Sequence, residues 1–443
     1  MRIQLSEHFT YSKLLRFTLP SIIMMIFTSI YSVVDGLFVS NFAGKTPFAA
    51  INLIMPLLII TGAPGFMIGT GGSAIVAKIM GEGRPEEANR QFSFLVCAAA
   101  VLGAAVGALG VALARPAAAL LGAEGEMLEH CVLYARIILA VNPCFILQNV
   151  FQSFFVAAEK PKLGLFFTVG AGLTNIVLDA LLVGALRWGA AGAAIATGLS
   201  QAVGGLGPVL YFLRENNSLL RLVRPRFDGK VLWKTCTNGS SELMSNISGS
   251  IVSMLYNFQL LRLAGEDGLA AYGAVMYVNF IFLAIFIGYA IGSAPVVSYH
   301  LGAENHGELQ SLLRKSVVLT GTVGVAMAGL AALASAPLSK IFVGYDPALY
   351  ALTVRGFRLY AVSYLLCGFN IFASSFFTAL NNGLASALIS FLRTLVFQCA
   401  AVLILPVFLD MDGVWLAISV AETAALAVSL ILLVRNRKAY RYW

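Results

Sequence analysis

Charged residues are scarce in this 443-residue sequence, since Asp, Glu, Lys and Arg together make up only 11% of it. A soluble domain usually carries about 25% of such residues, so an ordinary soluble fold is excluded. Apolar residues make up 59% of the chain, and the mean hydropathy is +0.85. Stretches long enough to cross a ~30 Å hydrocarbon core recur along the whole length. The sequence therefore predicts an all-α integral membrane protein that contacts the lipid bilayer throughout.

Cysteine and histidine are also few, with six and four residues. The cysteines are scattered without a CxxC or Cys/His spacing, so we expect neither a disulfide framework nor a metal site built on them. The GxGD-type signature of intramembrane aspartyl proteases is missing, and nothing resembles the selectivity filter of a channel. We therefore expect a carrier without an organic cofactor, and not an enzyme.

Basic residues concentrate in every second connection between the apolar spans. Twelve spans can be drawn: 14–40, 48–78, 91–114, 131–157, 164–186, 191–213, 236–261, 269–300, 316–336, 350–379, 385–407 and 413–434. With the N-terminus inside, the inner connections and termini hold 20 of the 29 Lys and Arg residues. The positive-inside rule then places both termini in the cytoplasm of a multi-pass protein of the plasma or inner membrane. The net charge of +8 thus reflects topology, and we expect no nucleic-acid partner.

The two halves of the chain repeat each other. A shift of 221 positions aligns Gly44 with Gly265 and Gly81 with Gly302. Each half has an even number of spans, so the copies share one orientation, as in secondary transporters whose substrate path lies between the halves. We predict two pseudo-symmetric six-helix lobes, at 1–213 and 236–443, joined by a cytoplasmic linker at 214–235. A short cytoplasmic tail ends the second lobe.

One carboxylate, Asp35, lies deep in the first span, within IYSVVDGLFVS. A charge at such a depth costs about 2.5–3.5 kcal/mol on insertion scales, so it normally faces a protein interior or a water-filled path. A purely structural hydrogen bond is the alternative. Asp179 lies equally deep in the fifth span. Neither carboxylate has an acidic counterpart at the matching position of the second half, so the repeat alone does not account for them.

Three further polar residues accompany these carboxylates. Tyr31 and Asp35 are four residues apart, as are Asn175 and Asp179, so each pair shares one helix face. Thr197 lies in the small-residue sixth span, GAAGAAIATGLSQ. Together these oxygens suit a proton or a sodium ion, and with sodium Asp35 and Asp179 would be metal ligands. The spacing leaves open whether the two faces meet.

The stretches LPSIIMMIFTSIYSVVDGLFVSNFAG, NIVLDALLV and GEGRPEEANR, with the two-lobe layout, resemble the multidrug and toxic compound extrusion (MATE) transporters. The resemblance implies an antiporter that exports cationic, amphipathic compounds in exchange for protons or sodium ions. It also implies a cation-coupling site and a hinge in the first helix at the following positions: Asp35, Asp179, Tyr31, Asn175, Thr197 and, for the hinge, Pro20. Some branches carry an acidic pair in spans seven and ten, but span ten here has Asn370 and no carboxylate.

The second half offers candidates for substrate recruitment in Glu242, Tyr256 and Met276. A capping role for Glu242 and simple packing for the other two are the alternatives. Arg393 and Glu422 are ionisable residues in apolar surroundings, and for Arg393 we favour a structural role. The nearest rival function is a lipid or lipid-linked oligosaccharide flippase of the same superfamily. We expect the protein to act on small organic cations and to function as a monomer.

Overall fold

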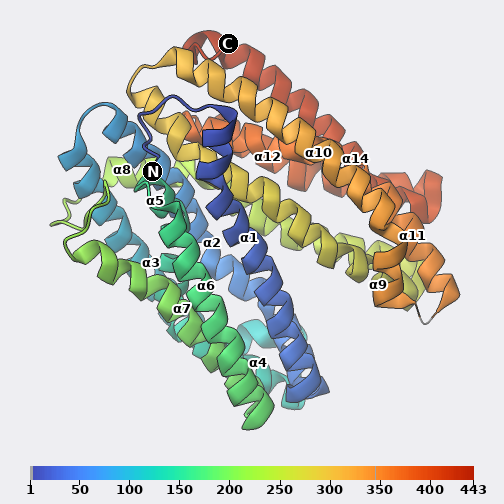
Figure 1. The fold of residues 1–443 in the computed structure, drawn as a ribbon. Helices are drawn as coiled ribbons and strands as arrows, with labels where there is room; N and C mark the ends of the chain where they lie inside the picture. Colours follow the sequence, from blue (N-terminus) through green and yellow to red (C-terminus); the bar gives the residue numbers. More distant parts are fainter. Residues whose placement is uncertain (1–2, 345) are drawn as a thin grey trace.

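The computed structural model describes residues 3–344 and 346–443, which contain helices and no strand. Figure 1 shows the helices grouped into two bundles. Their bounds are α1 (Tyr11–Phe38), η1 (Val39–Ala43), α2 (Lys45–Gly81), α3 (Pro85–Leu120), α4 (Gly125–Ala140), α5 (Asn142–Ala157), α6 (Pro161–Leu178), η2 (Asp179–Ala185), α7 (Gly189–Leu213), α8 (Gly229–Asn238), α9 (Ser240–Gly302), α10 (His306–Val343), α11 (Pro347–Ala361), α12 (Tyr364–Ala379), α13 (Gly383–Phe391), η3 (Leu392–Phe397) and α14 (Gln398–Tyr440). The elements named η are π-helical turns that continue the preceding α-helix.

The described residues form twelve membrane spans, as the sequence predicts. Eight helical segments are long and apolar enough to cross a membrane, and two bent pairs, α4 with α5 (57°) and α11 with α12 (47°), each add one span. The backbone of α9 breaks at Gly265, and that of α14 breaks at Asp410. Each of these two segments therefore holds two spans. The eight segments then contain ten spans, and the two bent pairs bring the total to twelve.

The repeat seen in the sequence has a counterpart in the backbone. Gly44 separates the first span from the second with a φ of +98°, and Gly265 separates the seventh from the eighth with a φ of +60°. Positive φ values are readily adopted only by glycine. The aligned glycines thus make equivalent turns in the two lobes.

The two lobes approach each other closely where α2 and α9 end. A Cβ atom on Gly81 would lie 2.0 Å from the Tyr299 carbonyl oxygen, and one on Gly302 would lie 2.0 Å from the Lys78 carbonyl oxygen. These two glycines are partners in the repeat. Their missing side chains let the two backbones cross in contact, close to the end of the molecule that carries both termini (Figure 1).

The hydrophobic core that the two lobes share lies at this terminus-bearing end. It includes Phe151 and Phe154 of the N lobe together with Val296 and Phe376 of the C lobe. Toward the opposite end each lobe has cores of its own, one in the N lobe and two in the C lobe. In Figure 1 the helices accordingly diverge from the terminus-bearing end, and α1 and α9 spread apart.

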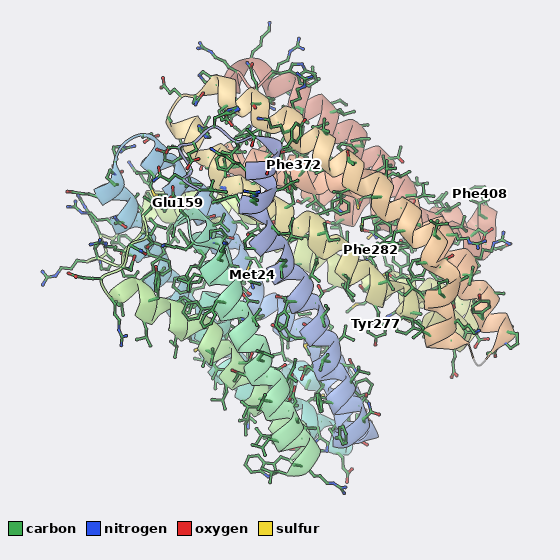
Figure 2. All side chains as sticks on the ribbon, viewed as in Figure 1. Met24, Glu159, Tyr277, Phe282, Phe372 and Phe408 are labelled. Carbon is green, nitrogen blue, oxygen red and sulfur yellow. The ribbon has the colours of Figure 1, made fainter. Side chains whose placement is uncertain are left out.

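An N-terminal strap, residues 3–10, joins the two lobes at the closed end. The Leu5 amide donates a hydrogen bond of 2.7 Å to the side chain of Glu159, just after the end of α5. Figure 2 labels Glu159. The Phe9 amide donates one of 2.9 Å to Glu308 in α10. Leu5 and Phe9 are fully buried. The strap is therefore part of the packed interface between the lobes.

The connection between the lobes is irregular over residues 214–228 and then forms α8. The Asp228 carboxylate caps α8 by accepting hydrogen bonds from the amides of Lys230 and Val231. The irregular part is held against α3, where the Val223 amide donates to Ser93 Oγ at 2.8 Å. The linker is thus docked on the N lobe.

Candidate functional site

Helix α1 and the α6–η2 span bring the two deep carboxylates together. Gly172 allows this approach, because a Cβ atom there would lie 2.4 Å from Phe27 and 3.0 Å from Tyr31 of α1. Further along the same face, Asp179 lies next to Asp35, close enough for the two carboxylates to interact. The two helix faces that the sequence left unconnected therefore meet inside the N lobe.

The paired carboxylates have few hydrogen-bond partners of their own. Asp179 is fully buried, and neither of its carboxylate oxygens has a partner of ordinary geometry among the described residues. The Oδ1 atom of Asp35 likewise has no hydrogen-bond partner among the described residues. A buried carboxylate without a counter-charge is strongly unfavourable. The geometry is suited to hold a cation between the two groups.

The other predicted ligands surround this pair. Tyr31 lies one helical turn before Asp35, and Asn175, which is 2% exposed, lies one turn before Asp179. The Asn175 amide nitrogen and the Thr197 hydroxyl have no hydrogen-bond partner among the described residues that meets ordinary geometric criteria. All five predicted coupling residues therefore belong to one lobe, where Asn175 and Asp179 are buried and the other three are half-buried.

A widened helical turn begins at the site. Asp179 is the first residue of the π-helical element η2, which runs to Ala185. Such turns are rare and occur often at functional sites, because they redirect side chains within a helix. The α6–η2 span thus changes its geometry at the carboxylate itself.

Two members of the site were missed by the sequence analysis. The Tyr134 side chain, 2% exposed, lies near both carboxylates and beside Thr197. Gln148, 7% exposed, reaches the Tyr31 side chain. The sequence does contain a pattern that indicates Gln148. In NPCFILQNVFQSFF, Gln148 and Gln152 are four residues apart and so share one face of an apolar helix. Tyr134 carries no comparable signal.

The three candidates for substrate recruitment do not form a cluster. Tyr256 is fully buried in the C lobe, with its ring stacked on that of Tyr272 at 5.0 Å. It therefore does not line the space between the lobes in this structure. Glu242 is half-buried near the start of α9, about 21 Å from Tyr256 along the helix axis. Met276 lies beyond the break in α9, where its sulfur accepts a hydrogen bond from the side-chain amide of Asn279.

The proposed hinge at Pro20 lies in an unbroken helix. Helix α1 runs from Tyr11 to Phe38, with Pro20 buried inside it. Proline cannot donate the hydrogen bond that would stabilise the preceding turn. The position is therefore a weak point of α1, and its role as a hinge stays a prediction.

Comparison with known proteins agrees with this arrangement. A family model described as MatE matches residues 20–181 and 243–402. The multidrug export protein MepA of Staphylococcus haemolyticus (strain JCSC1435) is 23% identical over 435 residues, covering 97% of this chain and 95% of that protein. A solved structure of MATE in complex with MaL6 has a TM-score of 0.93 at 22% identity, with 98% of each chain covered.

A second solved structure, described as the outward-facing conformation of a multidrug resistance MATE family transporter of the MOP superfamily, has a TM-score of 0.90. It is 22% identical and covers 98% of each chain. These similarities extend over both lobes and the connection between them. Since the family model matches well over half of the sequence, this chain belongs to the MatE family of multidrug export transporters.

Proposed function

We propose that this transporter is a secondary active antiporter that exports organic cations and drugs in exchange for protons or sodium ions. The observation that carries the proposal is the pairing of Asp35 with Asp179 inside the N lobe, where three of their four oxygens have no hydrogen-bond partner among the residues that the structure describes. Two adjacent negative charges in apolar surroundings repel each other strongly. A proton or sodium ion bound between them removes that repulsion, so ion occupancy changes the energy of the lobe.

Helix α1 connects this site to the other lobe. It carries Tyr31 and Asp35, and it also contacts α9, where the Ser29 hydroxyl donates to the Phe280 carbonyl at 3.3 Å. An ion can drive a conformational change only by binding one state more tightly than the other. A movement of α1 that follows ion binding would reach the C lobe directly, and this supports alternating access between the lobes.

The membrane orientation follows from the basic connections. We place the termini and residues 214–235 in the cytoplasm of a plasma or inner membrane, with the protein acting as a monomer on small-molecule cations. The closed, terminus-bearing end then faces the cytoplasm, and the diverging end faces outward. This arrangement corresponds to an outward-facing state, in which the coupling ion would bind from the outer side of the membrane.

Transport into proteoliposomes tests the proposal. The wild-type protein should concentrate a fluorescent organic cation when either a pH gradient or a sodium gradient is imposed alone, and the effective gradient identifies the ion. Asp35→Asn should abolish this accumulation, while its thermal melting stays close to that of the wild type. Asp267→Asn, at an exposed aspartate outside the site, is the matched control and should transport normally. Accumulation by Asp35→Asn at the normal rate would remove Asp35 from the coupling site.

A further inference from the structure

A row of buried polar side chains extends from the carboxylate pair toward the terminus-bearing end. We call it the polar seam; it consists of Gln148 and Gln152 on α5, Thr168 on α6 and Gln201 on α7. Each of these residues is at most 8% exposed. The Oε1 atoms of Gln152 and Gln201 have no hydrogen-bond partner among the described residues. Buried polar atoms are nearly always paired with protein or with ordered water, so these atoms point to water inside the lobe.

The polar seam is continuous with the coupling site. Gln148 reaches the Tyr31 side chain, which lies one turn from Asp35. On α6, Thr168 and Asn175 occupy the same buried face as Asp179. Eleven residues separate Thr168 from Asp179, which is about 16 Å along a helix. Polar groups thus extend from the carboxylates through half of the N lobe.

A small, partly open cavity lies at the end of this row that is nearer the terminus-bearing end. Gln148, Gln152 and Thr168 line it, together with Gly204 and several aromatic rings. The space open to the centre of a water molecule is ≈ 10 Å³, about the room that one water needs. Gly204 preserves the site, because a Cβ atom there would lie 2.8 Å from the Gln148 side chain. The cavity is therefore small and polar on one side.

Two stacked rings border the cavity toward the terminus-bearing end. Phe155 and Phe167 line it, with ring centroids 5.6 Å apart and planes inclined by 16°. Phe155 lies two residues before the end of α5, and Phe167 lies six residues after the start of α6. Both helices end or begin at that side of the molecule. The ring pair therefore lines the cavity on the side where α5 ends and α6 begins.

We propose that the polar seam is a passage by which protons leave the carboxylate pair inside the N lobe, separately from the space between the lobes. The inference rests on the proposed coupling function and names the proton as the ion. A carboxyl group gives its proton to a water molecule, which passes a proton to the next water, and the pair regains a negative charge. The glutamine amides do not titrate, but they orient these waters by donating and accepting hydrogen bonds. Room for a single water suits such a relay and excludes a hydrated sodium ion.

The decisive variant is Gln152→Leu, which keeps the size of the side chain and removes its hydrogen bonds. Gln91→Leu is the matched control, because Gln91 on α3 is 7% exposed, against 6% for Gln152, and does not line the cavity. Its Oε1 also has no hydrogen-bond partner among the described residues. In proteoliposomes with a pH gradient, Gln152→Leu should slow cation transport about tenfold, as expected when one hydrogen bond of the relay is lost. Gln91→Leu should transport at the wild-type rate. Gln152→Glu, which can again bind water, should recover most of the rate.

A second measurement separates this inference from the coupling function itself. In detergent solution, binding of an organic cation should release a proton, detected with a pH-sensitive dye, and Gln152→Leu should release as much as the wild type. No release from the wild type would overturn the coupling function. Normal release with normal transport by Gln152→Leu, or equal slowing by Gln91→Leu, would overturn the passage alone. Phe167→Ala should add a proton leak without substrate, and its absence would exclude the ring pair as the barrier.

Discussion

Arg393 and Glu422 form a buried ion pair inside the C lobe. Arg393 Nη2 lies 2.8 Å from Glu422 Oε1, and Glu422 is 1% exposed. The Asn370 amide donates to the same carboxylate at 2.7 Å. The C lobe thus neutralises its deep carboxylate with its own side chains. In the part of the chain that the structure describes, three of the four carboxylate oxygens of Asp35 and Asp179 in the N lobe have no hydrogen-bond partner.

Breaking this ion pair should lower stability without acting on coupling. Arg393→Met leaves the Glu422 carboxylate buried without its counter-charge, which costs about 3–5 kcal/mol of unfolding free energy. Thermal melting in detergent should show a clear decrease. The double variant with Glu422→Gln should recover most of it, because an amide still accepts the hydrogen bond from Asn370. A double variant as unstable as the single one would mean that Arg393 stabilises the fold through other contacts.

Asp35 and Asp179 should behave as one unit. Asp35→Asn and Asp179→Asn are each expected to abolish gradient-driven export, and the double variant should be little worse than either, because groups that act together are non-additive. Tyr31→Phe and Thr197→Ala should give partial losses. Initial rates of cation accumulation in proteoliposomes measure these effects. Losses that multiply in the double variant would indicate two separate sites.

The N-terminal strap should favour the state that is closed at the terminus-bearing end. Glu308 accepts hydrogen bonds from the Phe9 amide and from His8 Nδ1, the latter at 2.6 Å. Glu308→Gln should weaken these bonds by about 1.5–3 kcal/mol and increase the fraction of molecules in which the lobes separate at this end. Spin labels on Glu86→Cys and Arg314→Cys, at exposed positions of the two lobes, would report the separation by pulsed dipolar spectroscopy.

The repeat supplies the control for this experiment. Glu87 occupies the position in the N lobe that corresponds to Glu308, but it forms an ion pair with Arg84 on the surface. Glu87→Gln should therefore leave the distance distribution unchanged. A shift of equal size in both variants would show that loss of a surface charge, and not release of the strap, moves the lobes.

Glu242 should affect the choice of substrate more than ion coupling. It is half-buried, and the positive charge of Arg393 acts on its carboxylate. If the Glu242 carboxylate attracts cations, Glu242→Gln should weaken export of cationic compounds more than that of zwitterionic ones. Parallel transport assays with both kinds of compound measure the ratio. An equal loss for both kinds would assign Glu242 to folding or to the transport cycle in general.

The topology can be tested by cysteine labelling on intact cells, in a background without the native cysteines. Asn217→Cys lies in the linker and should be shielded from a membrane-impermeant reagent. Asp267→Cys follows the break in α9 at the opposite end and should react. The reverse pattern would invert the orientation and, with it, the assignment of the closed end to the cytoplasm.

Local features of the sequence were enough to identify the class, the spans and the candidate residues of the N lobe. Hydropathy and charge act on each helix separately, because every span must satisfy its own backbone hydrogen bonds in lipid. The aligned glycines at positions 44 and 265 revealed the repeat, and both adopt the positive φ that glycine accepts readily. Deep carboxylates are likewise visible in a single span, because their cost depends on depth alone.

The tertiary structure decided which of these residues meet. The contact of α1 with α6 depends on Gly172 accommodating Phe27 and Tyr31, residues far apart in the sequence. The rotation of each helix about its axis, set by such packing, brought Asp35 to Asp179 and buried Tyr256 in a lobe core. It also placed Tyr134 at the site. Helix rotation and tilt depend on the sum of contacts with several neighbours, so no single span contains the information.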